Sequence, residues 1–240
     1  QSAILPPEKL VKQYLKESFI LYKPKDIVAG DFYWLEQKNN MIMYAAADCT
    51  GHGVPGAMVS VVCNNALNKA VHEFNFFDPG EVLDKTREII IKEFSKSDEN
   101  VQDGMDIALC TILIDEYNQF LAGELDSLNL AFSGANNRLW IVRNDDITEV
   151  RPDKFPIGIY SEYKHFTTNH VQLLRNDIIY LFTDGYVDQF GGPNDKKFLL
   201  GRFRKLILKI SDCEMKEQQT IINDELELWM SYNNTEQVDD

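Results

Sequence analysis

The sequence predicts an α+β fold in which antiparallel sheets are layered against pairs of helices. Many short strand-like segments follow one another with tight turns, which is typical of antiparallel sheets. The helical segments come in pairs between or after the strands, and they do not alternate with single strands as in a parallel α/β fold. With 240 residues, of which 44% are hydrophobic, the chain is long enough for one sizeable domain.

A short helix and a hairpin are expected at the start of the chain. Pro6 and Pro7 precede an amphipathic segment, so we expect residues 1–17 to form a linker helix and residues 18–240 to form the domain. Strands are expected at 18–22, 28–37 and 41–48, with a turn at 38–40. The chain begins with Gln1 and not with Met, and we therefore expect upstream sensor modules in a longer protein.

Helix and strand signals continue along the rest of the chain. Pro55 suits the first turn of a helix over 55–73, and Asp78 can cap a second helix over 79–95. After a polar loop at 96–103, we expect strands at 105–114, 119–124, 127–133 and 138–142, and then a strand pair at 171–174 and 178–183. Helices are expected over 199–210 and 214–230.

Composition excludes several classes of function. A formal charge of -14 and an isoelectric point near 4.7 argue against binding to duplex nucleic acid, which requires Lys and Arg against the phosphates. No apolar run approaches the roughly 18 residues of a membrane span. The four cysteines are widely separated, which argues against a zinc site or a disulfide framework and favours a reducing, cytoplasmic setting.

Acidic residues at strand ends indicate a metal site. Asp48 ends an apolar run and precedes a glycine-rich turn, and Asp31, Asp184 and the pair Asp239-Asp240 also lie at the ends or edges of strand-like segments. An Asp beside a turn glycine is commonly a turn former or a helix cap. Several such residues together favour Mg²⁺ or Mn²⁺, because these ions prefer oxygen ligands.

These positions belong to a larger set of motifs: 26–34 (DIVAGDFYW), 48–57 (DCTGHGVPGA), 132–137 (FSGANN), 154–158 (KFPIG), 181–185 (LFTDG) and 236–240 (EQVDD). The set resembles the SpoIIE-type branch of the bacterial PPM metal-dependent protein phosphatases. The resemblance implies a four-layer αββα sandwich with two Mn²⁺ or Mg²⁺ ions, which hydrolyses phosphoserine or phosphothreonine on proteins.

The resemblance also implies a role for each residue of the centre. Asp48 would bridge both ions with help from the backbone carbonyl of Cys49, Asp31 would bind one ion, and Asp184 and Asp239 would bind the other. Asp240 occupies a neighbouring position. The loop geometry would depend on glycines, which are Gly51, Gly53 and Gly56.

The chain departs from the family pattern at several positions. Thr50 stands where the eukaryotic branch has a His proposed as general acid, and His52 is either a substitute for it or a structural residue. Lys23 and Lys25 are the cations nearest to the place of the phosphate-binding Arg. Ala135 and Asn136 replace part of a third metal site, so two ions are expected. Asp106 is interpreted as a surface strand start.

The resemblance favours a signalling phosphatase whose substrate is a phosphorylated anti-sigma-factor antagonist of the STAS-like kind, and it also suggests a homodimer. The helices over 55–73 and 79–95 could shift to complete or disrupt the metal site. The family continues into another strand after the position of Asp240, so we expect the last strand to be missing here. The alternatives are a catalytically degenerate module that regulates a partner by binding, and another divalent-metal hydrolase.

Overall fold

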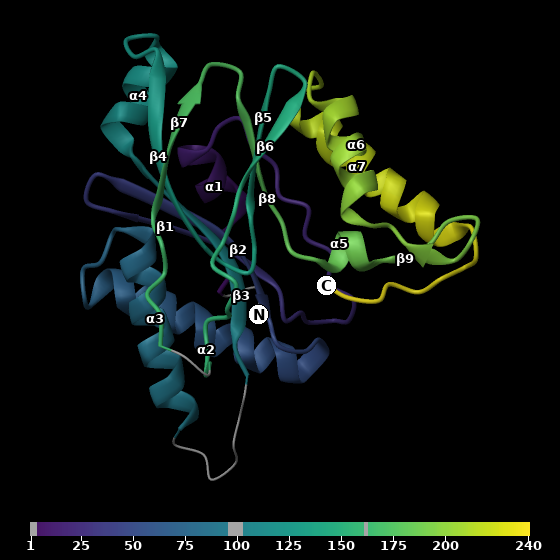
Figure 1. Cartoon of the computed structure of the whole chain (residues 1–240), viewed down its shortest axis with the longest axis horizontal. Helices are drawn as coiled ribbons and strands as arrows, with labels where there is room; N and C mark the ends of the chain where they lie inside the picture. The colour runs from purple at the N-terminus through teal and green to yellow at the C-terminus, as the bar shows by residue number, and fades with distance from the viewer. Residues whose placement is uncertain (1–3, 96–102, 161–162) are drawn as a thin grey trace.

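Two antiparallel sheets form the middle layers of the protein, and helices cover their outer faces (Figure 1). The computed structural model describes residues 4–95, 103–160 and 163–240. The larger sheet has the strand order β1-β2-β3-β4-β7 and the smaller sheet has the order β6-β5-β8. The strands of the larger sheet are β1 (Phe32–Lys38), β2 (Met41–Cys49), β3 (Met105–Leu113), β4 (Ser127–Ala135) and β7 (Asn169–Leu174). Those of the smaller sheet are β5 (Leu139–Arg143), β6 (Asp146–Val150) and β8 (Ile178–Leu181).

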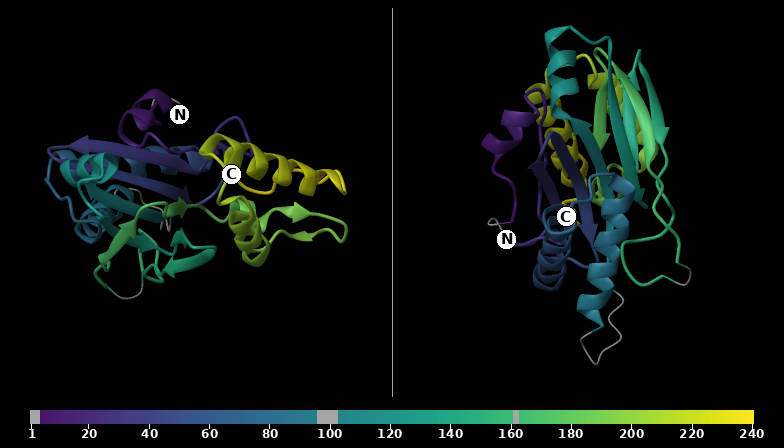
Figure 2. Two further views of the ribbon diagram at one scale, coloured as in Figure 1. Left: turned by 90° about the horizontal axis from the view of Figure 1, so that it is seen from above. Right: turned by 90° about the vertical axis from the view of Figure 1, so that its left-hand side faces the viewer.

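Helix pairs form the outer layers. Helices α2 (Gly53–His72) and α3 (Pro79–Phe94) lie on the larger sheet, and α6 (Leu200–Ile210) and α7 (Met215–Ser231) lie on the smaller one (Figures 1 and 2). The remaining elements are short: α1 (Glu8–Tyr14), α4 (Ile114–Ala122), α5 (Gly185–Asp188), and a hairpin of β9 (Phe190–Gly191) and β10 (Lys196–Lys197). In the described part of the chain, no helix is long and apolar enough to cross a membrane.

Three apolar clusters separate the four layers. The first joins α2 and α3 to the larger sheet and includes Trp34, Leu67 and Leu83. The second lies between the two sheets and includes Phe132, and it also receives Val11 of α1. The third joins the smaller sheet to α6 and α7 around Trp140. The αββα sandwich expected from the sequence is therefore confirmed.

Local sequence chemistry accounts for several element ends. The Asp78 carboxylate accepts hydrogen bonds from the backbone N–H groups of Gly80 and Glu81, which confirms the predicted cap of α3. Asn39 adopts φ +53° in the tight turn between β1 and β2, which confirms the predicted hairpin. The helix predicted within residues 1–17 is present as α1 over Glu8–Tyr14.

Three predictions of secondary structure are wrong. Residues 18–22 form no strand, because Phe19 and Leu21 pack towards α6 and α7 while Ile20 packs between the sheets, and no strand pairs with them. Residues 119–124 belong mainly to helix α4, which ends at Gly123 with φ +87°. The strands at 171–174 and 178–183 do not pair, because β7 joins β4 and β8 joins β5. Residues 96–102 of the predicted loop lie outside the described residues.

Candidate metal centre

The acidic residues predicted to form a site come from four separate segments. Asp48 is the penultimate residue of β2, and Asp31 directly precedes β1. The register pairs Phe32 with Ala47, which places Asp31 and Asp48 at the same end of the larger sheet. Asp184 directly precedes α5, and Asp239 lies in the C-terminal segment. Figure 1 shows the C-terminus beside α5, near the ends of these strands.

Asp48 lies at the centre of this group. Its carboxyl group shares hydrogen bonds with Asp31 and with Asp184, and the charge of Asp239 acts on all three residues. Burial, followed by the charge of Asp31, raises the pKa of Asp48 to about 10. Burial also raises the pKa of Asp31 to about 7, although a hydrogen bond from Thr183 opposes this rise. The structure therefore brings together the four Asp residues that the sequence predicted.

The chemistry of this group fits a divalent cation. Buried carboxylates that raise one another's pKa bind a cation favourably, because its charge replaces the protons that they would otherwise hold. The side chains are nevertheless not gathered into a ready ligand set: among residues 4–95, 103–160 and 163–240, no three His, Cys, Asp or Glu side chains could already hold a metal ion. Like charges repel one another, and a cation would be needed to draw the oxygens together.

The glycine loop after β2 brings three backbone segments into close contact. The carbonyl oxygen of Gly51 lies between Gly30 and Gly56, and a Cβ atom would come within 2.2 Å of it at Gly30 and within 2.1 Å at Gly56. Gly51 and Gly53 have φ values of +86° and +62°, which favour glycine. The glycines at 51, 53 and 56 therefore shape the loop, as expected, and Gly30 belongs to the same contact.

Asp240 and Cys49 have structural contacts of their own. The Asp240 carboxylate accepts hydrogen bonds from the backbone N–H groups of Lys25 (2.8 Å) and Gly30 (2.5 Å). It therefore fastens the loop before Asp31 to the C-terminal segment. The thiol of Cys49 is buried beside Cys63 in the core, so the thiol does not belong to the acidic group.

The residues considered for acid or phosphate-binding roles differ in their surroundings. The hydroxyl of Thr50 accepts a hydrogen bond from the backbone N–H of Gly104 at 3.1 Å, and this contact ties the end of β2 to the start of β3. His52 Nδ1 lies 3.1 Å from Asp26 Oδ2, and His52 Nε2 lies 3.2 Å from Lys25 Nζ. If Nδ1 carries the proton for Asp26, Nε2 accepts a hydrogen bond from Lys25.

The two lysines considered for phosphate binding differ in their side-chain contacts. The ammonium group of Lys23 is bound by Glu227 and by Asn223 of α7, at 3.0 Å from the Asn223 oxygen. Lys25 instead contacts the half-exposed ring of His52 at the rim of the glycine loop. The charge of Lys23 is therefore matched by a carboxylate within the fold, whereas Lys25 contacts a ring nitrogen of His52.

Asp106 belongs to the same region, and its interpretation as a surface strand start is incomplete. The register of β2 and β3 places Asp106 directly opposite Asp48. Both residues line a cavity of about 160 Å³ together with Thr50 and Pro156. Asn136 Nδ2 donates a hydrogen bond to Asp106 Oδ1 at 2.9 Å, and burial raises the pKa of Asp106. The strand register, which depends on residues far apart in sequence, is the signal that reveals this position.

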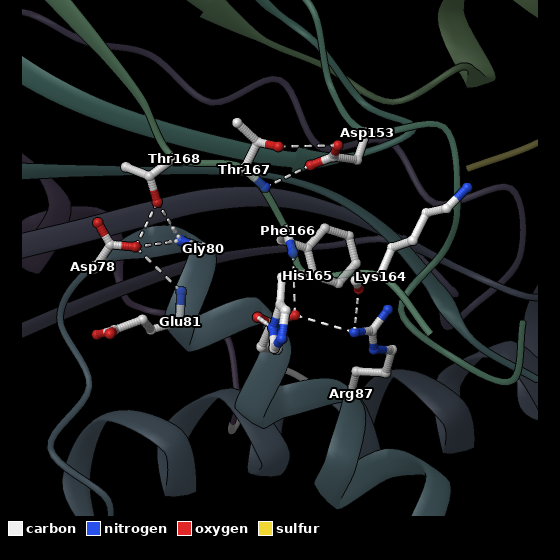
Figure 3. A network of polar contacts seen from close by, with 11 residues as sticks. Asp78, Gly80, Glu81, Arg87, Asp153, Lys164, His165, Phe166, Thr167 and Thr168 are labelled. Atoms are coloured by element: carbon white, nitrogen blue, oxygen red, sulfur yellow. Dashed lines mark hydrogen bonds and ion pairs between the residues drawn. The ribbon is translucent and has the colours of Figure 1, made fainter. Parts of the chain in front are cut away.

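Helix α3 contacts the connection between β6 and β7 through a network of polar contacts (Figure 3). Asp84 accepts hydrogen bonds at 3.1 Å from Arg87 and from the backbone N–H of Phe166, and Arg87 also donates to the carbonyl oxygen of Lys164 at 2.5 Å. Aromatic rings surround the buried guanidinium group of Arg87, namely Phe155, Tyr163 and Phe166. The same connection carries Pro156, Gly158 and Ile159, which line the cavity beside Asp48.

Comparisons with known proteins agree with this architecture. The SiaA-PP2C domain of Pseudomonas aeruginosa is 26% identical, with a TM-score of 0.84 over 99% of this chain and 88% of that one. The PP2C phosphatase domain of SpoIIE from Bacillus subtilis, solved with a fragment of its regulatory domain, is 17% identical, with a TM-score of 0.66 over 93% of this chain and 62% of that one. The PPM Ser-Thr phosphatase MsPP from Mycobacterium smegmatis, in complex with cacodylate, is 11% identical, with a TM-score of 0.52 over 89% of each chain.

No curated protein sequence matches the chain significantly. The family model described as stage II sporulation protein E (SpoIIE) matches residues 38–240. This match includes Asp48, Asp184 and Asp239, and the fold is that of PPM phosphatases. The chain therefore belongs to the SpoIIE family, whose PP2C-type fold supports a phosphatase class of function.

Proposed function

We propose that this chain is a metal-dependent protein phosphatase that hydrolyses phosphoserine or phosphothreonine on a signalling partner. One observation carries the proposal: Asp48 shares hydrogen bonds with Asp31 and Asp184 and feels the charge of Asp239, so four carboxylates from separate segments meet in a SpoIIE-family fold. An arrangement that raises the pKa of its own members is unfavourable for folding, which argues for a ligand that compensates it.

Each carboxylate has a proposed role toward two Mn²⁺ or Mg²⁺ ions. Asp48 would bridge both ions, Asp31 would bind one, and Asp184 and Asp239 would bind the other, with the carbonyl oxygen of Cys49 in support. Two such ions, when bound, supply Lewis acidity and a water of lowered pKa for phosphoryl displacement. The chain itself supplies the carboxylates, and its glycines let the loop beside Asp48 pack closely against the segment before Asp31.

The phosphate group of the substrate needs a positive partner beside so many carboxylates. We infer that Lys25 supplies it, because the ammonium of Lys25 contacts the His52 ring at the rim of the loop, whereas Lys23 is bound to Glu227. Asp26 supports this arrangement by fixing the orientation of the His52 ring. A flexible lysine can move from the ring to an incoming phosphate oxygen.

The substrate class and the cellular setting follow from the family. We propose a phosphorylated STAS-like anti-sigma-factor antagonist as the substrate and a cytoplasmic location for this domain. The Bacillus SpoIIE structure includes a fragment of a regulatory domain beside its phosphatase domain, and we propose that an upstream sensor and a homodimer likewise control this chain. Helices α2 and α3 are the candidates for transmitting such control, because α3 binds the connection between β6 and β7, and the same connection carries Pro156 and Ile159 of the cavity beside Asp48.

The test is Mn²⁺-dependent phosphate release from p-nitrophenyl phosphate and from a phosphoserine protein. Asp48→Asn and Asp184→Asn should each lower kcat by at least about 100-fold, because each removes a carboxylate of the proposed centre. Asp126→Asn is the matched control, since Asp126 is exposed in the turn before β4 and should leave activity unchanged. Full activity of either centre variant would exclude the proposed mechanism.

The same experiment separates the alternative of a degenerate regulatory module. Such a module would bind a partner, and it could bind Mn²⁺, but it would release no phosphate under any metal condition. Mn²⁺ binding by calorimetry, combined with an absence of turnover on both substrates, would therefore favour the alternative over the phosphatase.

A further inference from the structure

A second carboxylate lies one helical turn after Asp184. Asp188 ends the short helix α5, four residues after Asp184, and its charge raises the pKa of Asp184. Asp106 also lies near enough for Asp184 to raise its pKa. Asp184 is therefore near acidic side chains that are not among the residues proposed to hold the two ions.

A lysine from a separate hairpin meets this group. The turn between β9 and β10 returns the chain so that Lys197 pairs with Phe190 in the hairpin register. The ammonium group of Lys197 lies 2.6 Å from Asp188 Oδ2. It also acts on Asp184, whose pKa it lowers against the effects of burial and of Asp188. Lys197 is thus a fixed positive charge beside one of the proposed metal ligands.

The location of Lys197 has a consequence for the number of ions that the site holds. An ammonium group is a compact charge that competes directly with a small divalent ion for carboxylate oxygens. A divalent ion between Asp184 and Asp188 would have to displace Lys197 and would use an oxygen of Asp184 that the proposed centre needs. The contact with Asp188 places the ammonium group of Lys197 where it would compete with such an ion.

We propose that Lys197 is a positioning residue: its ammonium group neutralises Asp188, excludes a further divalent ion, and so reserves the carboxylate of Asp184 for the ions at Asp48. This inference rests on the proposed function, since it concerns the number of ions beside a proposed ligand. Of its residues, Lys197 and Asp188 lie outside the motifs on which the family resemblance was based, whereas Asp184 lies within one of them.

The experiment measures the stoichiometry of Mn²⁺ by equilibrium dialysis and metal analysis. Lys197→Met should bind about one more Mn²⁺ ion per chain than the parent, because the freed Asp188 and Asp184 then offer oxygens to it. The matched control is Lys196→Met, which makes the same change of net charge, from -14 to -15. Lys196 lies on the opposite face of the same strand and is exposed, so the control should bind as the parent does.

The double variant Lys197→Met/Asp188→Asn identifies the carboxylate responsible. It should return to the parental stoichiometry, and Lys197→Arg, which keeps the charge, should also bind as the parent does. Equal Mn²⁺ binding by Lys197→Met and Lys196→Met would overturn the inference, and so would an additional ion that persists in the double variant. If Lys197→Met fails to fold by circular dichroism, Lys197→Gln makes the same comparison.

A failure of the inference about Lys197 can be distinguished from a failure of the proposed phosphatase function. A parent chain that binds no Mn²⁺ would contradict the two-ion phosphatase, whereas the difference between Lys197→Met and Lys196→Met would still test the exclusion by Lys197. A contact between Lys197 and substrate phosphate would instead raise KM for p-nitrophenyl phosphate in Lys197→Met with no change in Mn²⁺ stoichiometry. That result would refute the role proposed here.

Discussion

Gly56→Ala is the substitution that most directly probes how the fold holds Asp48. Gly56 lies in the first turn of α2, and a Cβ atom there would come within 2.1 Å of the Gly51 carbonyl oxygen and 3.1 Å of the Gly30 Cα atom. Both neighbours are backbone atoms, so no side chain can rotate away to make room. The segments that carry Asp31 and Asp48 would have to move apart.

The expected magnitude follows from two opposing effects. Alanine in place of glycine within a helix stabilises by roughly 0.5–1 kcal/mol. Overpacking at a tight site costs about 1–3 kcal/mol, and a backbone contact of 2.1 Å belongs at the upper end of that range. The net expectation is a loss of about 2 kcal/mol in the free energy of unfolding.

The chain supplies a matched control in Gly201, which lies in the first turn of α6 and whose added Cβ atom would meet no atom within 4 Å. Gly201→Ala should raise the free energy of unfolding by roughly 0.5–1 kcal/mol and leave Mn²⁺-dependent phosphate release unchanged. Urea unfolding measures both variants, and p-nitrophenyl phosphate hydrolysis measures the centre. If Gly56→Ala were stabilised as much as Gly201→Ala and kept full activity, the close packing of the glycines would not determine the geometry around Asp48.

Three further outcomes are expected. Lys25→Ala should raise KM for p-nitrophenyl phosphate about tenfold with little change in Mn²⁺ affinity, whereas Lys23→Ala should leave KM unchanged; equal effects of the two would remove Lys25 from phosphate binding. Because burial raises the pKa of Asp48 to about 10 and that of Asp31 to about 7, Mn²⁺ must displace protons, so calorimetry should show its affinity rising with pH; a flat profile would contradict this. Arg87→Met should lower the free energy of unfolding in urea by about 3 kcal/mol, because it removes a buried guanidinium group that binds Asp84 and the carbonyl oxygen of Lys164, and a loss below about 0.5 kcal/mol would count against the network.

The parts of the fold that the sequence predicted depend on local chemistry. The cap at Asp78 and the hairpin turn around Asn39 each involve only a few neighbouring residues. A local signal was also missed: Gly123, in the left-handed conformation, ends helix α4 within the segment 119–124 that was predicted to be a strand.

Another wrong prediction concerns strand pairing, which depends on residues far apart in the sequence. The turn around Asn176 has φ +67° and suggests a hairpin, yet β7 and β8 pair with strands of different sheets. The ion pair between Arg143 of β5 and Asp177 fastens this crossover at its turn. Neither partner strand can be chosen from the turn alone, because the choice depends on which apolar faces meet in the core.

The residues of the candidate site also fall into two groups, those that local motifs identified and those that could be recognised only from the strand pairing. Asp31, Asp48, Asp184 and Asp239 were identified from motifs, and the structure brings them together. Asp106, in contrast, could be recognised only once the register of β2 and β3 was known. Lys197 needed the hairpin of β9 and β10 to approach Asp188.

The adjacent residues Asp239 and Asp240 differ in the contacts that their carboxylates make. Asp240 accepts hydrogen bonds from the backbone N–H groups of Lys25 and Gly30, so its carboxylate is already engaged. A carboxylate held by two backbone donors is less available to a cation. The charges of both residues act on Asp31, but the charge of Asp239 also acts on Asp48. Fastening the loop before Asp31 to the C-terminal segment also fixes Asp31 relative to Asp239. The tendency of like charges to separate is therefore opposed by these two hydrogen bonds, and we expect Asp240 to contribute to the proposed centre by holding Asp31 near Asp239.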